Sequence, residues 1–165
     1  MHITIDPAGF VSCLNHRWRC ALGRGAIVHD KIEGDGASPA GTWALGRVFY
    51  RPDRGAAPQT GLTVVALHPK WGWCDDPAHA DYNRLVTLPH PARHEILWRD
   101  DALYDVVVEL LYNTDPIISD RGSAIFMHVA KPDYSPTEGC IALNLKDLKA
   151  LLQLCNDGDT VTIPD

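Results

Sequence analysis

Residues 123–163, SAIFMHVAKPDYSPTEGCIALNLKDLKALLQLCNDGDTVTI, contain the pattern that decides the fold. The first part, Ser123–His128, alternates as a β-strand does, so His128 shares one face with every second residue before it. The predicted strand ends at His128, and a loop then leads to Gly139 and Cys140. The sequence therefore predicts a histidine at a strand's end, joined by one loop to a Gly-Cys pair.

The residues after Cys140 predict a helix and a last strand. Asn144 is a favourable N-cap, and Asp147 lies in the first turn, where a negative charge interacts well with the helix dipole. The apolar residues at the helical spacing i, i+3, i+4 and i+7 are Leu148, Leu151, Leu152 and Cys155. The turn sequence NDGD ends this helix, and Thr160–Ile163 predicts the final strand.

Glycine and proline, 13 and 12 in number, divide the upstream part of the chain into short segments joined by turns. The β-rich segments between the turns are Thr42–Arg51, Leu62–Leu67, Arg84–Leu88 and Asp105–Tyr112. A chain of 165 residues, 45% hydrophobic and 22% charged, has the size and composition of one globular domain. We therefore predict a single domain over residues 1–165, mainly β with flanking helices (α+β).

The formal net charge of −6 makes nucleic acid and anionic membrane poor partners. A peptide, a glycan or a small molecule fits better. The N-terminal segment lacks a basic start followed by an apolar stretch, and no segment approaches the ~20 apolar residues of a membrane span. We expect a cytoplasmic protein without a membrane span, or a periplasmic one if a leader has been removed.

The five cysteines are odd in number and form no CxxC pair. At least one thiol is therefore free, and zinc-ribbon spacing does not occur. The 8 histidines form no HExxH pair, so a zinc hydrolase has little support. Cys74 has Asp75, Asp76 and His79 nearby, which leaves a metal-dependent hydrolase as a weak alternative. We favour a structural role for Cys74 and predict no metal ion and no cofactor.

Cys140 differs from the other cysteines because a glycine precedes it and a helix follows soon after. Gly139 lets the backbone turn tightly and lets a substrate approach the thiol. Nearby peptide N–H groups can then converge on an oxyanion. A thiol becomes a strong nucleophile only when a base removes its proton, and His128 is the natural candidate for that base.

With these residues the chain resembles the L,D-transpeptidase catalytic domain family, also called YkuD or ErfK/YbiS/YcfS/YnhG. The family's hallmark is a strand ending in His, a loop, and a Ser/Thr-His-Gly-Cys segment leading into a helix and a last strand. The matching residues here are His128 and 137–140 (TEGC). Upstream, GDGASPAGTWAL (Gly34–Leu45) is similar to the family's TPxG stretch, so the resemblance spans roughly Gly25 to Ile163. It implies a YkuD-like β-sandwich, with the catalytic cysteine just before the C-terminal helix and last strand.

Two positions depart from the family pattern. Glu138 stands where the family usually has a histidine, and Ala142 stands where it usually has an arginine. The missing arginine removes an anchor for a substrate carboxylate or for local structure. The cations that could replace it are Arg121, Lys131 and Arg47.

The resemblance implies a cysteine acyl-transfer enzyme that acts on peptidoglycan stem peptides through a thioester. Cys140 is then the nucleophile, and His128 is the base that later protonates the leaving amine. The N–H groups of Gly139 and Cys140 supply the oxyanion hole, and the Val129 carbonyl orients the imidazole. Glu138 is expected to meet the ammonium of a diaminopimelate side chain. The predicted substrate-binding residues are Glu138, Thr137, Arg121 and Tyr134.

The acyl acceptor decides which activity results. Attack by an amine gives an L,D-transpeptidase that forms cross-links or exchanges D-amino acids, whereas attack by water gives an L,D-carboxypeptidase. Because no export signal is recognised, we favour a cytosolic L,D-carboxypeptidase that releases terminal D-Ala from muropeptide tetrapeptides in recycling. The alternatives are the transpeptidase and a non-catalytic domain that binds muropeptides or a protein. The expected partners are stem peptides or soluble muropeptides.

Overall fold

One large β-sheet forms the framework of the computed structural model, which describes residues 1–164. Its strands are β1 (His2–Asp6), β2 (Phe10–Cys13), β3 (His16–Arg19), β6 (Gly41–Tyr50), β7 (Val64–Ala66), β11 (Val106–Leu110), β12 (Phe126–Val129), β13 (Ile141–Leu143) and β14 (Thr160–Ile163). They run in the order β13-β12-β11-β6-β14-β1-β2-β3, and β7 pairs with β6. The prediction of a mainly β fold is confirmed.

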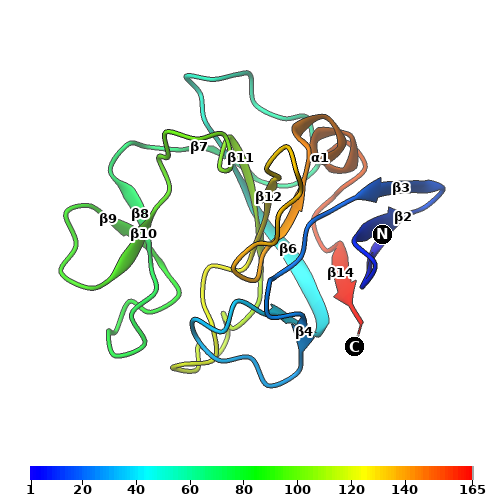
Figure 1. Cartoon of the computed structure of the whole chain (residues 1–165). Coiled ribbons are helices and arrows are strands. Elements are labelled where there is room, and N and C mark those ends of the chain that lie inside the picture. The colour runs from blue at the N-terminus through cyan, green and yellow to red at the C-terminus, as the bar shows by residue number, and fades with distance from the viewer. Residues whose placement is uncertain (165) are drawn as a thin grey trace.

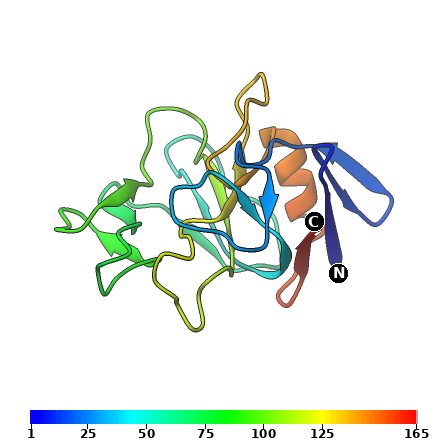
Figure 2. The same cartoon turned by 60° about the horizontal axis from the view of Figure 1, so that its bottom comes forward.

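Two smaller sheets and one helix complete the described elements. β10 (His94–Ile96), β8 (Trp71–Cys74) and β9 (Leu85–Thr87) form a three-stranded sheet, and β4 (Ile27–Val28) pairs with β5 (Ser38–Pro39). Figure 1 shows the three-stranded sheet at one end of the molecule and β1–β3 at the other, beyond helix α1 (Leu145–Leu152). Both views show β1 beside β14, with which it pairs in parallel (Figure 2). Among the described residues there is no helix with the length and apolar character needed to cross a bilayer.

The central strands present one apolar face to helix α1. The Asn144 side chain caps this helix by accepting a hydrogen bond from the Asp147 N–H, as predicted. The strand and helix residues of the resulting core include Val106, Val108, Leu110, Met127, Val129, Ile141, Leu143, Leu148, Leu151 and Leu152. Since side chains alternate along a strand, the residues between these point to the opposite face of the sheet.

That opposite face carries the second apolar cluster. Its members are Phe49, Leu67, Trp73, Leu97, Tyr104, Val107, Phe126 and Cys140. His128 lies two residues after Phe126 on β12 and therefore shares its face. The face of the sheet away from α1 thus holds both predicted catalytic residues.

Strand β13 comes last in the sheet order, but its outer side is covered by the chain near residue 21. The Ala21 N–H donates to the Ala142 carbonyl at 2.8 Å, and the Ala142 N–H donates to the Ala21 carbonyl at 2.9 Å. The Thr137 N–H donates to the Leu22 carbonyl at 2.9 Å. An N-terminal segment therefore satisfies backbone groups on both sides of Cys140.

The predicted strands are confirmed, with small shifts at their ends, as β6, β7, β9, β11, β12 and β14. Strand β12 begins later than predicted because Ala124 has a φ of 53°, which is incompatible with an extended strand. The helix ends at Leu152, so the prediction that Cys155 belongs to it is wrong. Cys155 is still buried, and its thiol donates to the Leu151 carbonyl at 3.3 Å.

The sequence analysis gave no bounds for strands β1–β5, β8, β10 and β13. The last three have only three or four residues each, too few for a clear alternating pattern. β8 also lies among turn-forming residues, and β10 exists through its antiparallel pairing with β8. These strands depend on contacts between distant segments, which local sequence does not reveal.

Candidate active site

The parallel pairing of β12 with β13 brings His128 and Cys140 to one cavity. In this register His128 lies opposite Ala142, so Cys140, just before β13, lies beside Phe126. The Phe126 N–H accordingly lies 3.4 Å from Cys140 Sγ. Both His128 and Cys140 line a cavity of about 750 Å³, and they are only 6% and 7% exposed. The two predicted catalytic side chains therefore line one cavity.

The imidazole of His128 is held in one orientation. Its Nδ1 lies 2.9 Å from the Val129 carbonyl oxygen, the contact that the sequence reading expected. A carbonyl can only accept, so Nδ1 carries the proton and Nε2 carries the lone pair. The Tyr104 ring packs edge-on against the imidazole at a centroid distance of 5.3 Å. Burial lowers the pKa of His128 to about 4, although the Val129 contact opposes the shift, so the ring is neutral at pH 7.

The Cys140 thiol is protonated in the resting site. Its S–H donates to the Ala124 carbonyl at 3.3 Å. Burial raises the pKa of Cys140 to about 12, and the Glu95 carboxylate contributes to this rise. The resting pair is therefore a thiol and a neutral imidazole. Such a pair can react by general-base catalysis, in which His128 removes the thiol proton during attack.

Gly139 adopts a backbone conformation that favours glycine, with a φ of 124°. A Cβ at this position would lie 2.6 Å from the Ala37 carbonyl oxygen. The Gly139 carbonyl accepts a hydrogen bond of 2.9 Å from the hydroxyl of Ser38, which is fully buried. The GDGASPAGTWAL stretch, in which Ser38 lies, thus supports the turn before Cys140. That motif was the one sequence signal that could have identified Ser38.

Thr137 organises the loop around the nucleophile. Its Oγ1 accepts from the Gly139 N–H at 3.2 Å and donates to the Cys140 carbonyl at 2.6 Å. Thr137 lines the cavity, as a substrate-binding residue should, but its hydroxyl is engaged within the loop. Of the two N–H groups predicted for the oxyanion hole, that of Gly139 is thus already in a hydrogen bond.

Glu138 lines the cavity but is exposed, and it forms a salt bridge of 2.9 Å with Arg24. Among the three cations considered as replacements for the family arginine, Lys131 lines the cavity. Arg47 instead pairs with Glu109 at 2.6 Å and borders a different pocket. The structure therefore leaves Lys131 as the candidate among these three.

The structure does not bring the other two predicted substrate-binding residues to the cavity. Arg121 is exposed, with its guanidinium 3.7 Å from Asp30. The Tyr134 hydroxyl accepts a hydrogen bond of 3.0 Å from the Asn144 amide, and its ring lies 4.3 Å from the Arg19 guanidinium. Neither side chain lines the cavity that contains Cys140.

Sequence reasoning missed Glu95 and Tyr104, which form a wall of the cavity beside the catalytic pair. The Tyr104 hydroxyl donates to Glu95 Oε1 at 2.5 Å. Burial raises the pKa of both side chains. Because the Tyr104 ring also contacts His128, this pair connects β10 of the small sheet to the predicted base.

Asn83 was also missed, and it fixes the backbone beside the thiol. This buried side chain accepts hydrogen bonds at Oδ1 from the Trp73 indole at 2.9 Å and from the Ala124 N–H at 3.0 Å. The Ala124 carbonyl in turn accepts a hydrogen bond from the Cys140 S–H. Asn83 therefore connects the small sheet to the immediate surroundings of the sulfur atom.

We predict that Glu95→Gln makes Cys140 react several-fold faster with iodoacetamide at pH 9. The carboxylate disfavours the thiolate, and an isosteric amide removes that charge while its oxygen can still accept from Tyr104. The rate is measured by mass spectrometry of the Cys140 peptide. Glu138→Gln is the matched control and should have a smaller effect, because the Glu138 charge raises the pKa of Cys140 less than the Glu95 charge does. An unchanged or slower rate in Glu95→Gln would contradict the prediction.

Comparison with known proteins gives one family match. Residues 11–163 match the model of the L,D-transpeptidase catalytic domain, YkuD. Among solved structures, the helical cell shape determining protein Pgp2 from Campylobacter jejuni is similar, with 15% sequence identity and a TM-score of 0.50. Its K307A mutant is similar at 16% identity. Each match covers 98% of this chain and 46% of the other, so this chain spans about half their length and the likeness concerns the fold. No curated protein matches the chain.

Proposed function

Because the chain belongs to the L,D-transpeptidase catalytic domain family, we propose that it is an L,D-carboxypeptidase that releases terminal D-Ala from peptidoglycan tetrapeptides. The observation that carries this proposal is that Cys140 and His128 line the same cavity. A thiol and an imidazole in one cavity supply the nucleophile and the base that acyl transfer through a thioester uses.

In the proposed reaction, Cys140 Sγ attacks the carbonyl carbon of the L,D-peptide bond while His128 Nε2 accepts the thiol proton. The Cys140 N–H stabilises the oxyanion, and the Gly139 N–H can join it when Thr137 releases its hydrogen bond. The imidazolium then protonates the departing amine of D-Ala, which leaves a thioester. Water, deprotonated by His128, attacks the thioester and releases the tripeptide, and the proton returns to the thiol.

The charges around the cavity support a substrate that carries both signs. The cationic lining residues are Lys31, Arg93, Arg99 and Lys131, and the acidic ones are Glu33, Asp75, Glu95, Asp101 and Glu138. A stem tetrapeptide ends in a carboxylate and carries an ammonium and a carboxylate on its diamino acid. We assign Lys131 to the terminal carboxylate and Glu138 to the ammonium, since both lie close in sequence to the catalytic pair and line its cavity. The ammonium would then replace Arg24 as the partner of Glu138.

The confinement of the nucleophile supports hydrolysis over cross-linking. Cys140 is only 7% exposed. The cavity that it lines has a volume of about 750 Å³, which suits the end of a peptide. Water reaches such a site more readily than the amine of a second, polymer-bound stem peptide. The state of the cysteines supports a cytosolic role in muropeptide recycling, since all five are free thiols, which persist best in a reducing compartment.

The test is incubation of the purified protein with a disaccharide tetrapeptide, with and without an excess of a D-amino acid. We expect disaccharide tripeptide and free D-Ala as the main products under both conditions, measured by chromatography and mass spectrometry. Exchange products alone would support the transpeptidase instead. Saturable binding without any product would support the non-catalytic domain, and either result would overturn the hydrolase proposal.

A further inference from the structure

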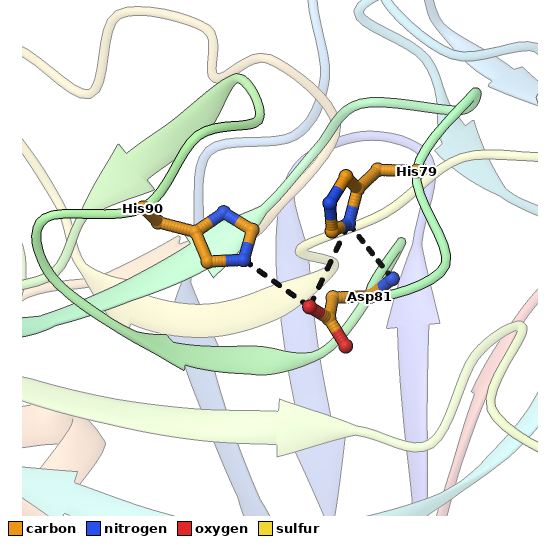
Figure 3. Close-up of side chains that lie close together, drawn as sticks. All are labelled: His79, Asp81 and His90. Atoms are coloured by element: carbon orange, nitrogen blue, oxygen red, sulfur yellow. Dashed lines mark hydrogen bonds and ion pairs between the residues drawn. The ribbon is translucent and has the colours of Figure 1, made fainter.

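Three metal-ligating side chains converge outside the proposed active site, at the loops of the small sheet. His79 and Asp81 lie in the loop between β8 and β9, and His90 lies in the loop between β9 and β10. Figure 3 shows both imidazoles directed toward the Asp81 carboxylate. His90 Nε2 lies 3.2 Å from Asp81 Oδ2, and His79 Nδ1 lies 3.6 Å from the same oxygen. One ligand atom from each of the three residues lies within 4.8 Å of the others.

The separations of both imidazoles from the Asp81 oxygen suit one metal ion. Tetrahedral zinc with bonds of about 2.0–2.1 Å places its ligand atoms about 3.3 Å apart. The separations of 3.2 and 3.6 Å from Asp81 Oδ2 lie on either side of that value, and the third pair of ligand atoms lies within 4.8 Å. Two imidazoles and a carboxylate are also a donor set that zinc commonly has in proteins. We propose that His79, Asp81 and His90 form a site for a divalent transition-metal ion, Zn²⁺ foremost, with a water molecule as the fourth ligand.

The present hydrogen bonds explain how the site is arranged without a metal. The Ala92 N–H donates to His90 Nδ1 at 3.3 Å, so His90 carries its proton on Nε2, facing Asp81. The Asp81 N–H likewise donates to His79 Nδ1 at 3.1 Å. When His90 binds a metal ion through Nε2, the ring proton moves to Nδ1, and the hydrogen bond from the Ala92 N–H is lost. Binding through His79 Nδ1 likewise displaces the hydrogen bond from the Asp81 N–H.

The burial and charge of the cluster favour a cation. The side chain of His90 is 11% exposed, that of His79 is 32% exposed and that of Asp81 is 47% exposed, so the site is held by the protein and is still reachable from solvent. With neutral imidazoles the three groups carry one negative charge. The two rings, at a centroid distance of 5.0 Å and an interplanar angle of 74°, approach Asp81 from different directions. A tetrahedral ion needs ligands that converge in this way.

The position of the site gives it a structural consequence. An ion bound there would connect the β8–β9 loop to the β9–β10 loop, which leads into β10. β10 contains Glu95, and Glu95 forms a wall of the cavity with Tyr104. The proposed ion would therefore fix one wall of the cavity, at a distance from the reacting atoms. This inference does not depend on the proposed catalytic function.

The experiment uses the Cys140→Ser variant, so that the thiol and imidazole of the active site cannot form a competing zinc site. Calorimetric titration with Zn²⁺ should give one equivalent bound, whereas Mg²⁺ and Ca²⁺ should show no binding. Adding His79→Ala or His90→Ala should weaken Zn²⁺ binding at least tenfold. Co²⁺ should give the intense visible bands of a tetrahedral complex, and these bands should disappear in the same variants.

Two further variants make the test independent of folding. Asp81→Asn keeps the shape of the side chain and should also weaken Zn²⁺ binding. His16→Ala removes an exposed histidine on β3, at the opposite end of the molecule, and should leave binding unchanged. Circular dichroism of each metal-free variant checks that its fold is intact. No Zn²⁺ binding in Cys140→Ser, or binding that is unaffected by the His79 and His90 substitutions in folded protein, would overturn the proposal.

Discussion

Cys140→Ser is expected to abolish D-Ala release, with a loss on the order of 10⁴-fold or more in kcat, because removal of a covalent nucleophile leaves little residual catalysis. A hydroxyl is far less acidic than a thiol, and the neutral His128 beside it is a weak base with a pKa of about 4. The product is measured by chromatography, and the missing thioester is checked by mass spectrometry of the intact protein.

The loss in Cys140→Ser should come from chemistry and not from unfolding. A serine hydroxyl can still donate to the Ala124 carbonyl, as the thiol does, so the melting temperature should change little. Cys155→Ser is the matched control, because that hydroxyl can likewise donate to the Leu151 carbonyl. It should keep its activity. Equal losses in the two variants would contradict the assignment of Cys140 as nucleophile.

His128→Ala is expected to lower kcat by about 10²–10⁴-fold, the usual contribution of a general base. In the wild-type protein, burial lowers the pKa of His128 to about 4, so Nε2 holds a free lone pair at any pH well above that value. The acid limb of kcat/KM should therefore fall as the pH decreases through about 4, and not near the ordinary histidine value of about 6.5. The pH profile is measured with the tetrapeptide substrate.

Two variants separate the base from its structural contacts. His128→Asn keeps a side-chain donor that can reach the Val129 carbonyl, so it should fold and still lack the base. His68→Ala removes an exposed histidine whose Nδ1 accepts from the Lys70 N–H, and it should leave activity unchanged. Full activity in a folded His128→Asn protein would show that another group removes the thiol proton.

The catalytic pair could be predicted because its signal is local. Alternation up to His128, a glycine before Cys140 and a capped helix after it are all present in one continuous stretch. Arg121 and Tyr134 were predicted on the same ground of nearness in sequence, but nearness does not fix direction. Tyr134 has a φ of 56°, and its side chain contacts Asn144 and Arg19 away from the cavity.

The wall of the site could not be predicted, because it depends on pairing between distant segments. Glu95 reaches the cavity through β10, a strand of three residues that exists through its pairing with β8. Nothing near Glu95 in the sequence distinguishes it from a surface carboxylate. The burial of Cys140, which raises its pKa, could not be predicted either. It arises from the folded surroundings and not from the neighbours of Cys140 in sequence.

The cover on β13 has a consequence for the behaviour of the protein in concentrated solution. A strand at the end of a sheet usually offers free N–H and C=O groups to a second molecule, and such contacts lead to aggregation. Here Ala21 occupies both backbone groups of Ala142, and Leu22 accepts from Thr137. The edge of β13 that follows the nucleophile is therefore closed to intermolecular strand addition.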